Sequence, residues 1–225
     1  MSLKNTFAAV LLAGSVVFFP SISYGFNVLK TATVTKNSGE VVNIIAVDGA
    51  IEIGDADKIK ALFNKTGFKN LWISSSGGVI LDSLKIADFV RENNIKVVVP
   101  PKEKCASGCS LIFLAANEKY LHFTSKLGVH RSATVSQKEE GSSKLDRKED
   151  EGSRVVDAVM LAKLVSWNIP LEIIMSTMTT SQVSKEHITM LSSVDLFEVE
   201  LKGYSTIDDK EFFESKIIFS EENYK

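Results

Sequence analysis

Apolar runs of strand length alternate with stretches of helical apolar spacing along much of this chain. Residues 42–48 and 70–74 are typical of buried strands, because they are short, rich in apolar side chains and followed by turn residues. Residues 56–65 and 80–90 come after these strands and carry apolar side chains three and four positions apart, as one face of a helix does. Asp55 is the expected N-cap of the first helix. Strands joined by helices in this order predict a largely parallel sheet.

The same order continues toward the C-terminus, through further strands, turns and helices. The expected elements are a strand at 95–99 that stops at two prolines, a turn and apolar stretch at 105–116, strands at 120–123 and 127–130, helices at 154–167 and 171–178, a small element at 193–200 and a strand at 216–220. A chain of 225 residues has room for one domain with a substantial core, whereas two would be cramped. We therefore expect a single α/β domain over residues 26–225.

Residues 132–152 interrupt the pattern. They are polar, mixed in charge and nearly devoid of large apolar side chains. A solvated loop and a lid over a site would both have this composition, so the segment is interpreted as a polar insertion or lid.

Residues 1–25 have the composition of a secretory signal peptide. Lys4 gives a positive start, residues 7–19 form an uncharged apolar run, and small residues precede the expected cut after Gly25. An uncleaved anchor is the alternative, but the run is shorter than the ~20 apolar residues that span a bilayer. We expect cleavage near Gly25, no stable membrane span afterwards, and a periplasmic or secreted location.

The charge of the mature chain excludes some partners. Only Lys4 among the charged residues lies in the leader, so 25 basic and 28 acidic side chains remain, with their signs dispersed. Such a balance gives no electrostatic footprint for nucleic acid or anionic lipid. Two cysteines without a nearby histidine or second cysteine pair do not complete a tetrahedral shell, so no metal site is expected, and no cofactor either.

Cys105 and Cys109 are the only cysteines, and they bracket Ser107. In an oxidising compartment paired thiols usually close, and a disulfide here would enclose a very short loop and hold the turn around the serine. Two buried free thiols four residues apart are the alternative interpretation.

Ser107 is the candidate nucleophile and His130 the candidate base. Ser107 precedes an apolar helix, where the dipole and free N–H groups favour developing negative charge, although an ordinary N-cap serine has the same surroundings. His130 ends a short strand 23 residues later, a separation that one crossover spans. His122 lies in an apolar strand and is the better candidate for a packed structural histidine, and His187 lies in a polar stretch.

Glycines supply candidate donors for an oxyanion. Gly77 and Gly78 follow the strand at 70–74 and allow the backbone to turn its N–H groups toward a neighbouring site. With the N–H of Gly108 they would form an oxyanion hole, each well-placed donor contributing about 3 kcal/mol. A plain glycine turn is the alternative.

Four motifs together resemble the proteolytic subunit of the Clp protease and its relatives. They are Ile-Ile-Ala-Val-Asp-Gly-Ala-Ile at 44–51, Ser-Ser-Ser-Gly-Gly at 74–78, Cys-Ala-Ser-Gly-Cys at 105–109 and Gly-Val-His-Arg at 128–131. The likeness covers about residues 44–130, continues weakly to 206, and is best to exported Clp-protease-like proteins. It implies a Clp protease/crotonase-like spiral of ββα units.

The resemblance also implies a function. It makes the chain an exported serine hydrolase, acting on peptides or proteins through an acyl-enzyme, with Ser107 as nucleophile, His130 as base, and the N–H groups of Gly78 and Gly108 as oxyanion donors. It implies a homo-oligomer as well. An ATPase partner is not expected, because an exported protein would meet no ATP. Acyl-CoA chemistry of the crotonase branch is disfavoured because coenzyme A is cytosolic.

The third catalytic residue does not carry over. In the Clp subunit an aspartate stands a few residues before a Leu-Ser pair, but here Leu191-Ser192 is preceded by Glu186, His187 and Ile188. Glu186 is the nearest upstream carboxylate and Asp195 the nearest downstream one. Either Glu186 or Asp195 takes the place of the aspartate, or Ser107 and His130 act as a dyad, or catalysis has been lost. The last case would make the chain an inactive Clp-protease-like binding or scaffold protein in the periplasm.

Overall fold

The computed structural model describes residues 26, 28–35, 39–137, 145–181, 188–207 and 216–223. Within them the main sheet has the strand order β11-β6-β4-β3-β2-β1-β12. Neighbours from β11 to β2 run parallel, and β1 and β12 extend the edge antiparallel. The strands are β1 (Val28–Thr35), β2 (Val41–Asp48), β3 (Asn70–Ser74), β4 (Lys96–Val99), β6 (Lys119–His122), β11 (Tyr204–Ile207) and β12 (Lys216–Asn223). The predicted, largely parallel sheet is confirmed.

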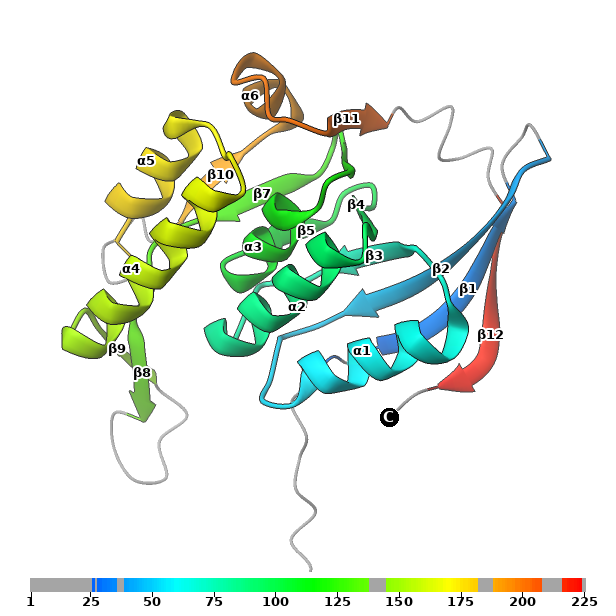
Figure 1. The fold of residues 1–225 in the computed structure, drawn as a ribbon, viewed down its shortest axis with the longest axis horizontal. Helices are drawn as coiled ribbons and strands as arrows, with labels where there is room; N and C mark the ends of the chain where they lie inside the picture. Colours follow the sequence, from blue (N-terminus) through cyan, green and yellow to red (C-terminus); the bar gives the residue numbers. More distant parts are fainter. Residues whose placement is uncertain are drawn as a thin grey trace, which may run out of the picture.

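The helices pack in a row, each of α1 to α5 in contact with the next, on one side of the sheet (Figure 1). They are α1 (Asp55–Thr66), α2 (Ile80–Glu92), α3 (Gly108–Ala115), α4 (Glu151–Ser166), α5 (Leu171–Thr179) and α6 (Ser193–Glu198). All residues of α3 are buried, which agrees with a sequence that is apolar on every side. The helix that follows the candidate nucleophile is therefore at the centre of the core. Among the described residues, no helix combines the length and apolar character that a bilayer crossing requires.

A second, smaller sheet carries the residues on either side of the candidate site. Its order is β10-β7-β5, with β5 (Lys104–Ala106) parallel to β7 (Lys126–Val129) and β10 (Thr189–Leu191) antiparallel to β7. The polar insertion contains a hairpin of β8 (Thr134–Gln137) and β9 (Leu145–Lys148), below α4 in Figure 1.

The sequence predicted β3 and came within three residues of the ends of α1, α2, α4 and α5. It missed β1, β5, β10, β11 and the β8–β9 hairpin. The hairpin was missed because its strands are polar and lack the alternation of a half-buried strand. The N-cap of α1 was wrong by one residue, since Gly54 holds that position in a left-handed conformation and Asp55 begins the helix.

A carboxylate from another helix satisfies the start of α1. Asp82, in the first turn of α2, is buried, and its Oδ1 accepts hydrogen bonds from the N–H groups of Gly54 (3.0 Å) and Ala56 (3.3 Å). The adjoining Ile51 forms a parallel bridge with Gly78. Asp82 therefore fixes the loop that supports the Gly77-Gly78 turn.

Replacing Asp82 by alanine is expected to lower the free energy of unfolding by about 2 kcal/mol, because two N–H groups lose their acceptor in a buried position. Urea unfolding measures this. Asp57→Ala is the matched control, since Asp57 is an exposed carboxylate in the first turn of α1 and is expected to cost much less. Equal losses in the two variants would contradict the role given to Asp82.

Candidate active site

Ser107 occupies a turn between β5 and α3. Its backbone has φ 56° and ψ −128°, a combination that non-glycine residues rarely adopt and that costs about 1–3 kcal/mol. It holds the N-cap position of α3. An ordinary N-cap serine accepts a hydrogen bond from a backbone N–H of the first turn, but the Ser107 side chain makes no such bond. A serine on a strained strand-to-helix turn is the arrangement that exposes a nucleophilic hydroxyl in hydrolases.

A disulfide and a hydrogen bond hold this turn. Cys105 and Cys109 form a disulfide across Ser107, as one of the two interpretations of the sequence expected. Closing so short a loop contributes about 2 kcal/mol in the chain-entropy account. The hydroxyl of Ser110 donates to the carbonyl of Ser107 at 2.6 Å. The strained conformation is thus fixed from both sides.

The pairing of β5 with β7 brings His130 to Ser107. Ala106 pairs with Gly128, and the N–H of Ser107 donates to the Gly128 carbonyl at 2.9 Å. His130 directly follows β7, so both residues lie at the carboxyl ends of adjacent parallel strands. Gly128 permits the close approach, because a Cβ there would lie 2.9 Å from the Ala106 Cβ and 2.5 Å from a side-chain carbon of Ile188.

The Gly77-Gly78 turn reaches the same point from β3. The N–H of Ser75 donates to the Lys104 carbonyl, and the N–H of Ala106 donates back to the Ser75 carbonyl, both at 2.9 Å. Gly77 has φ +91°, and a Cβ there would lie 2.4 Å from the Ser107 Cβ. Only glycine fits between these backbones.

The N–H groups of Gly78 and Gly108 are candidates for an oxyanion hole. Over the described part of the chain neither has a hydrogen-bond acceptor, although the N–H groups of Gly77 and Val79 beside Gly78 both have one. Gly108 begins α3, where the helix dipole favours negative charge. The Gly78 nitrogen lies 3.8 Å from where a Cβ on Gly108 would be, so the two groups are close neighbours.

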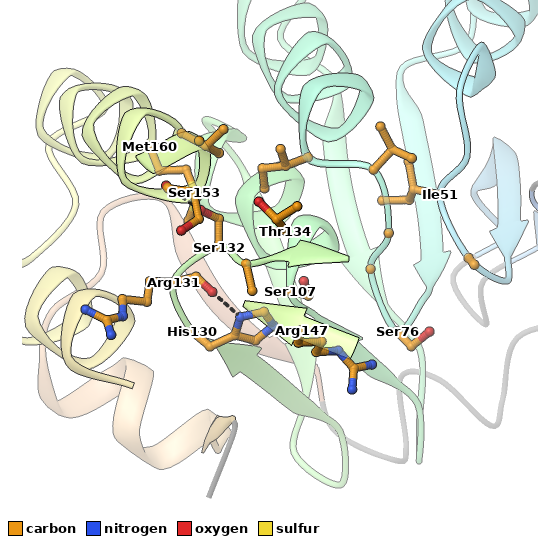
Figure 2. A pocket seen from close by; sticks show the side chains of 18 of the residues that line it. Ile51, Ser76, Ser107, His130, Arg131, Ser132, Thr134, Arg147, Ser153 and Met160 are labelled. Carbon is orange, nitrogen blue, oxygen red and sulfur yellow. Dashed lines mark hydrogen bonds between the residues drawn. The ribbon is translucent and has the colours of Figure 1, made fainter. Parts of the chain in front are cut away.

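The imidazole of His130 is almost buried and has one ring nitrogen fixed. Its Nδ1 lies 2.6 Å from the Arg131 carbonyl oxygen, and a carbonyl only accepts, so Nδ1 carries the hydrogen of this bond. In the neutral ring Nε2 then keeps a lone pair and is able to take a proton. Figure 2 shows Ser107 and His130 together in the pocket, with the Arg131 bond as a dashed line.

Ser107 and His130 line one cavity of about 610 Å³. Its other walls come from the loop at Ile51, the Gly77-Gly78 turn, the β8–β9 hairpin and α4. No hydrogen bond joins the Ser107 hydroxyl to His130, and in enzymes without substrate such bonds are often long and tighten only in the complex. The cavity has the size of a ligand pocket and holds both candidate groups.

Of the two carboxylates expected from the sequence, Asp195 lies among the described residues, and its hydrogen bonds there are to Ser192. Asp195 caps α6, where its carboxylate accepts from the N–H of Ser192 at 2.5 Å and from the Ser192 hydroxyl at 2.6 Å. The hydroxyl bond, above all, holds the pKa of Asp195 below its usual value. Glu186 and His187 lie outside the described residues.

His122 is packed, as expected, with its Nδ1 2.7 Å from the Thr124 hydroxyl. No cluster of three or more potential metal ligands occurs in the parts of the chain that the structure describes.

Arg147 and Asp157 were not predicted from the sequence, whereas Arg131 belongs to the Gly-Val-His-Arg motif. Arg131 and Arg147 line the cavity, and Asp157 on α4 binds the backbone beside the histidine. Arg147 was missed because the insertion offered no apolar pattern, and Asp157 because it stands 27 residues from His130 within an ordinary helical stretch. A lone acidic residue on an otherwise apolar helix segment was the only available signal.

Comparisons with known proteins give a likeness of structure. No protein-family model matches the sequence, and no curated protein matches it either. Among solved structures, a serine-to-alanine mutant of the 1510-N membrane-bound stomatin-specific protease has 14% identity and a TM-score of 0.54, covering 76% of this chain and 79% of that chain. A point mutant of ClpP1 from Listeria monocytogenes has 15% identity and a TM-score of 0.51, covering 74% of this chain and 92% of that chain.

A lysine-to-alanine mutant of the same stomatin-specific protease, in complex with a substrate peptide, has 14% identity and a TM-score of 0.50, covering 71% of this chain and 69% of that chain. The chain has a Clp-protease-like fold. The expected Clp protease/crotonase-like architecture is therefore confirmed. At this level of identity the likeness concerns the fold, and the chemistry has to be argued from the site itself.

Gly77→Ala is expected to destabilise the protein by about 2–4 kcal/mol, because it adds a positive-φ penalty and an overlap with Ser107 that neither backbone can relieve. Gly54→Ala is the matched control, since its φ of +92° is nearly the same but no atom lies within 4 Å of the added Cβ. That variant carries the φ penalty of about 1 kcal/mol alone. Urea unfolding measures the stability of both variants. A Gly77 variant as stable as the Gly54 variant would show that the Gly77-Gly78 turn does not contact the Ser107 turn.

Proposed function

We propose that this protein is a serine hydrolase that cleaves peptides through an acyl-enzyme. The observation that carries the proposal is the strained backbone of Ser107 on a strand-to-helix turn, beside His130 and facing a shared cavity. Strain of this kind persists where the surrounding structure enforces it, and it gathers at functional sites. The N–H groups of Gly78 and Gly108, which have no acceptor among the described residues, support the same conclusion.

The reaction proceeds in two displacements. The Ser107 oxygen attacks the peptide carbonyl carbon while His130 Nε2 takes the hydroxyl proton, and the carbonyl oxygen becomes an oxyanion held by the N–H groups of Gly78 and Gly108. The C–N bond breaks, and the amine leaves with the proton from Nε2. Water then attacks the ester, gives its proton to Nε2, and releases the acid as the Ser107 hydroxyl is restored.

A peptide is the substrate class best supported. Apolar side chains, among them Val79, Val156 and Met160, line one part of the cavity. Charged groups from Glu52, Arg131 and Arg147 line another part. No lysine is among the described residues that line it, which favours His130 over a lysine as the base. The likeness to a protease solved with a substrate peptide supports the same class.

The polar insertion takes part in this function as a lid. Thr134 and Arg147, from the two strands of the hairpin, both line the cavity. Arg147 is exposed and projects beside His130 in Figure 2. The hairpin is thus positioned to cover a bound peptide and exclude water.

Glu186 and Asp195 are the candidates that the sequence offers for a carboxylate in direct contact with His130. Glu186 is the direct candidate from the sequence, and Glu186→Gln tests it. The carboxylate of Asp195 is a weaker candidate, because it is already engaged at the N-terminus of α6.

A fluorophosphonate probe is expected to label the mature protein covalently at Ser107. Ser107→Ala removes the acceptor and abolishes labelling, and His130→Ala lowers the labelling rate ~10²- to 10⁴-fold, as loss of a general base does. In-gel fluorescence and peptide mass spectrometry measure both. Ser193→Ala, at another buried serine that lies on α6, is the control and is expected to keep the label.

Absence of labelling in the folded wild-type protein would favour the alternative, a binding or scaffold module. In that case a peptide held in the cavity would protect backbone amides of the Gly77-Gly78 turn without being cleaved.

Export is part of the proposal. The mature protein is expected to begin at Phe26 when isolated from the periplasm or medium, which intact mass spectrometry checks. A chain that still carries residues 1–25 in the membrane fraction would contradict it.

An assembly of several copies is also proposed. Exposed apolar side chains on three helices support it, among them Val155 on α4, Leu171 on α5 and Phe197 on α6.

A further inference from the structure

The peptide group between Arg131 and Ser132 is hydrogen-bonded on both sides. Its carbonyl oxygen, from Arg131, accepts the hydrogen of His130 Nδ1 at 2.6 Å. Its N–H, from Ser132, donates to Asp157 Oδ1 at 2.6 Å. The peptide is trans, so these two groups point to opposite sides, and one flat amide connects the imidazole to the carboxylate.

We propose that Asp157 is the third member of the catalytic group and acts on His130 through this peptide. A carboxylate that accepts the amide hydrogen polarises the amide and makes its carbonyl oxygen a stronger acceptor, because consecutive hydrogen bonds strengthen one another. The stronger acceptor stabilises the positive charge on His130 when the ring takes the serine proton. Asp157 is a positioning residue, since it touches neither substrate nor imidazole.

The strand that flanks His130 leaves no place for a direct carboxylate at the position opposite it. Thr189 pairs with Val129 and Met190 with Gly128, so the antiparallel register sets Ile188 opposite His130. A side-chain carbon of Ile188 occupies the space over Gly128. An apolar residue stands where a carboxylate would have to approach from β10.

The connecting peptide is held rigidly, which a relay of this kind requires. The N–H of Arg131 donates to the Thr180 carbonyl at 3.1 Å, and the Arg131 side chain pairs with Glu149. The Ser132 hydroxyl oxygen lies 2.8 Å from both Asp157 Oδ1 and the Ser153 carbonyl oxygen, so its one hydrogen is shared between these two acceptors. Contacts from α4, from the end of α5 and from the segment after β9 therefore fix the plane of the amide.

Other charges around the ring have to be considered in any titration. Glu52, Arg131 and Arg147 line the same cavity as His130. The Arg131 guanidinium is turned away from Ser107 (Figure 2). It forms an ion pair with Glu149. Asp157 differs from all of these, because it alone binds the amide whose carbonyl accepts from the imidazole.

The test replaces Asp157 by asparagine, which keeps an oxygen acceptor for Ser132 but removes the negative charge. The pKa of His130 is expected to fall, because the imidazolium loses stabilisation. Proton NMR of the ring in the Ser107→Ala background measures this, with His130→Gln identifying the resonance. In the enzyme kcat/KM for a fluorogenic peptide is expected to fall about 10- to 100-fold, as activity does when a metal-binding histidine loses its outer hydrogen-bond partner. The acidic limb of the pH profile moves to lower pH.

Asp88→Asn is the matched control. Asp88 is half-buried like Asp157 and pairs with Lys163 of α4 at 2.7 Å. Among the described residues no hydrogen bond connects it to the Arg131–Ser132 peptide. It is expected to leave the pKa of His130 and kcat/KM unchanged. An Asp157→Glu variant, which restores the charge, is expected to recover part of the pKa.

The effect on rate rests on the proposed function, whereas the effect on the pKa does not. A fall in the pKa of His130 in Asp157→Asn supports the relay even in a protein that no probe labels. Labelling of the wild type with an unchanged pKa and pH profile in Asp157→Asn would overturn the relay and leave the hydrolase intact. Loss of activity with an unchanged pKa would assign Asp157 a structural role alone and would equally overturn it.

Discussion

The hydrogen bond from the Ser107 N–H to the Gly128 carbonyl is the contact on which the site depends. It continues the parallel pairing of β5 with β7 one residue beyond the strand, so it sets Ser107 and His130 at the ends of adjacent strands. A slip of one residue would turn each side chain to the opposite face of the sheet. The same pairing requires a glycine at position 128, because the neighbouring strands leave no space for a Cβ.

The rest of the local structure compensates the unfavourable backbone of Ser107. The conformation costs about 1–3 kcal/mol, and the disulfide contributes about 2 kcal/mol by restricting the unfolded chain. The fully buried helix α3 anchors the far side of the turn in the core. Gly77 lies against Ser107 from β3, so the turn is also confined sterically. A serine that served only as a helix cap would need none of these supports, because an N-cap residue adopts an extended backbone without strain.

The sequence predicted the parts of the molecule that have a period or a motif. Alternation of apolar strands and helices was enough for β3 and the helices, and the cysteines around Ser107 pointed to the turn and its disulfide. It could not predict β8 and β9, whose polar residues have no apolar side to bury. Nor could it predict the hydrogen bond that the Ser132 N–H donates to Asp157. Nearly every residue has a backbone N–H, so such a bond does not restrict which residue type stands at position 132. Long-range contacts to the main chain are invisible in a pattern of side chains.

The same backbone contact bears on how the imidazole is held when Ile188, and not a carboxylate, lies at the position opposite His130. In serine proteases with a direct triad, replacing the aspartate by asparagine costs ~10⁴ in rate chiefly because the imidazole takes the wrong tautomer. Here the acceptor at Nδ1 is the carbonyl of Arg131, which has no hydrogen to donate. It therefore selects the tautomer with the hydrogen on Nδ1 and the lone pair on Nε2, even when the nearby carboxylate loses its charge. Orientation and charge, which one aspartate supplies together in a direct triad, are thereby divided between a main-chain oxygen and a more distant carboxylate. The division lets β10 keep an apolar residue beside the histidine, since the negative charge reaches the ring from α4 instead.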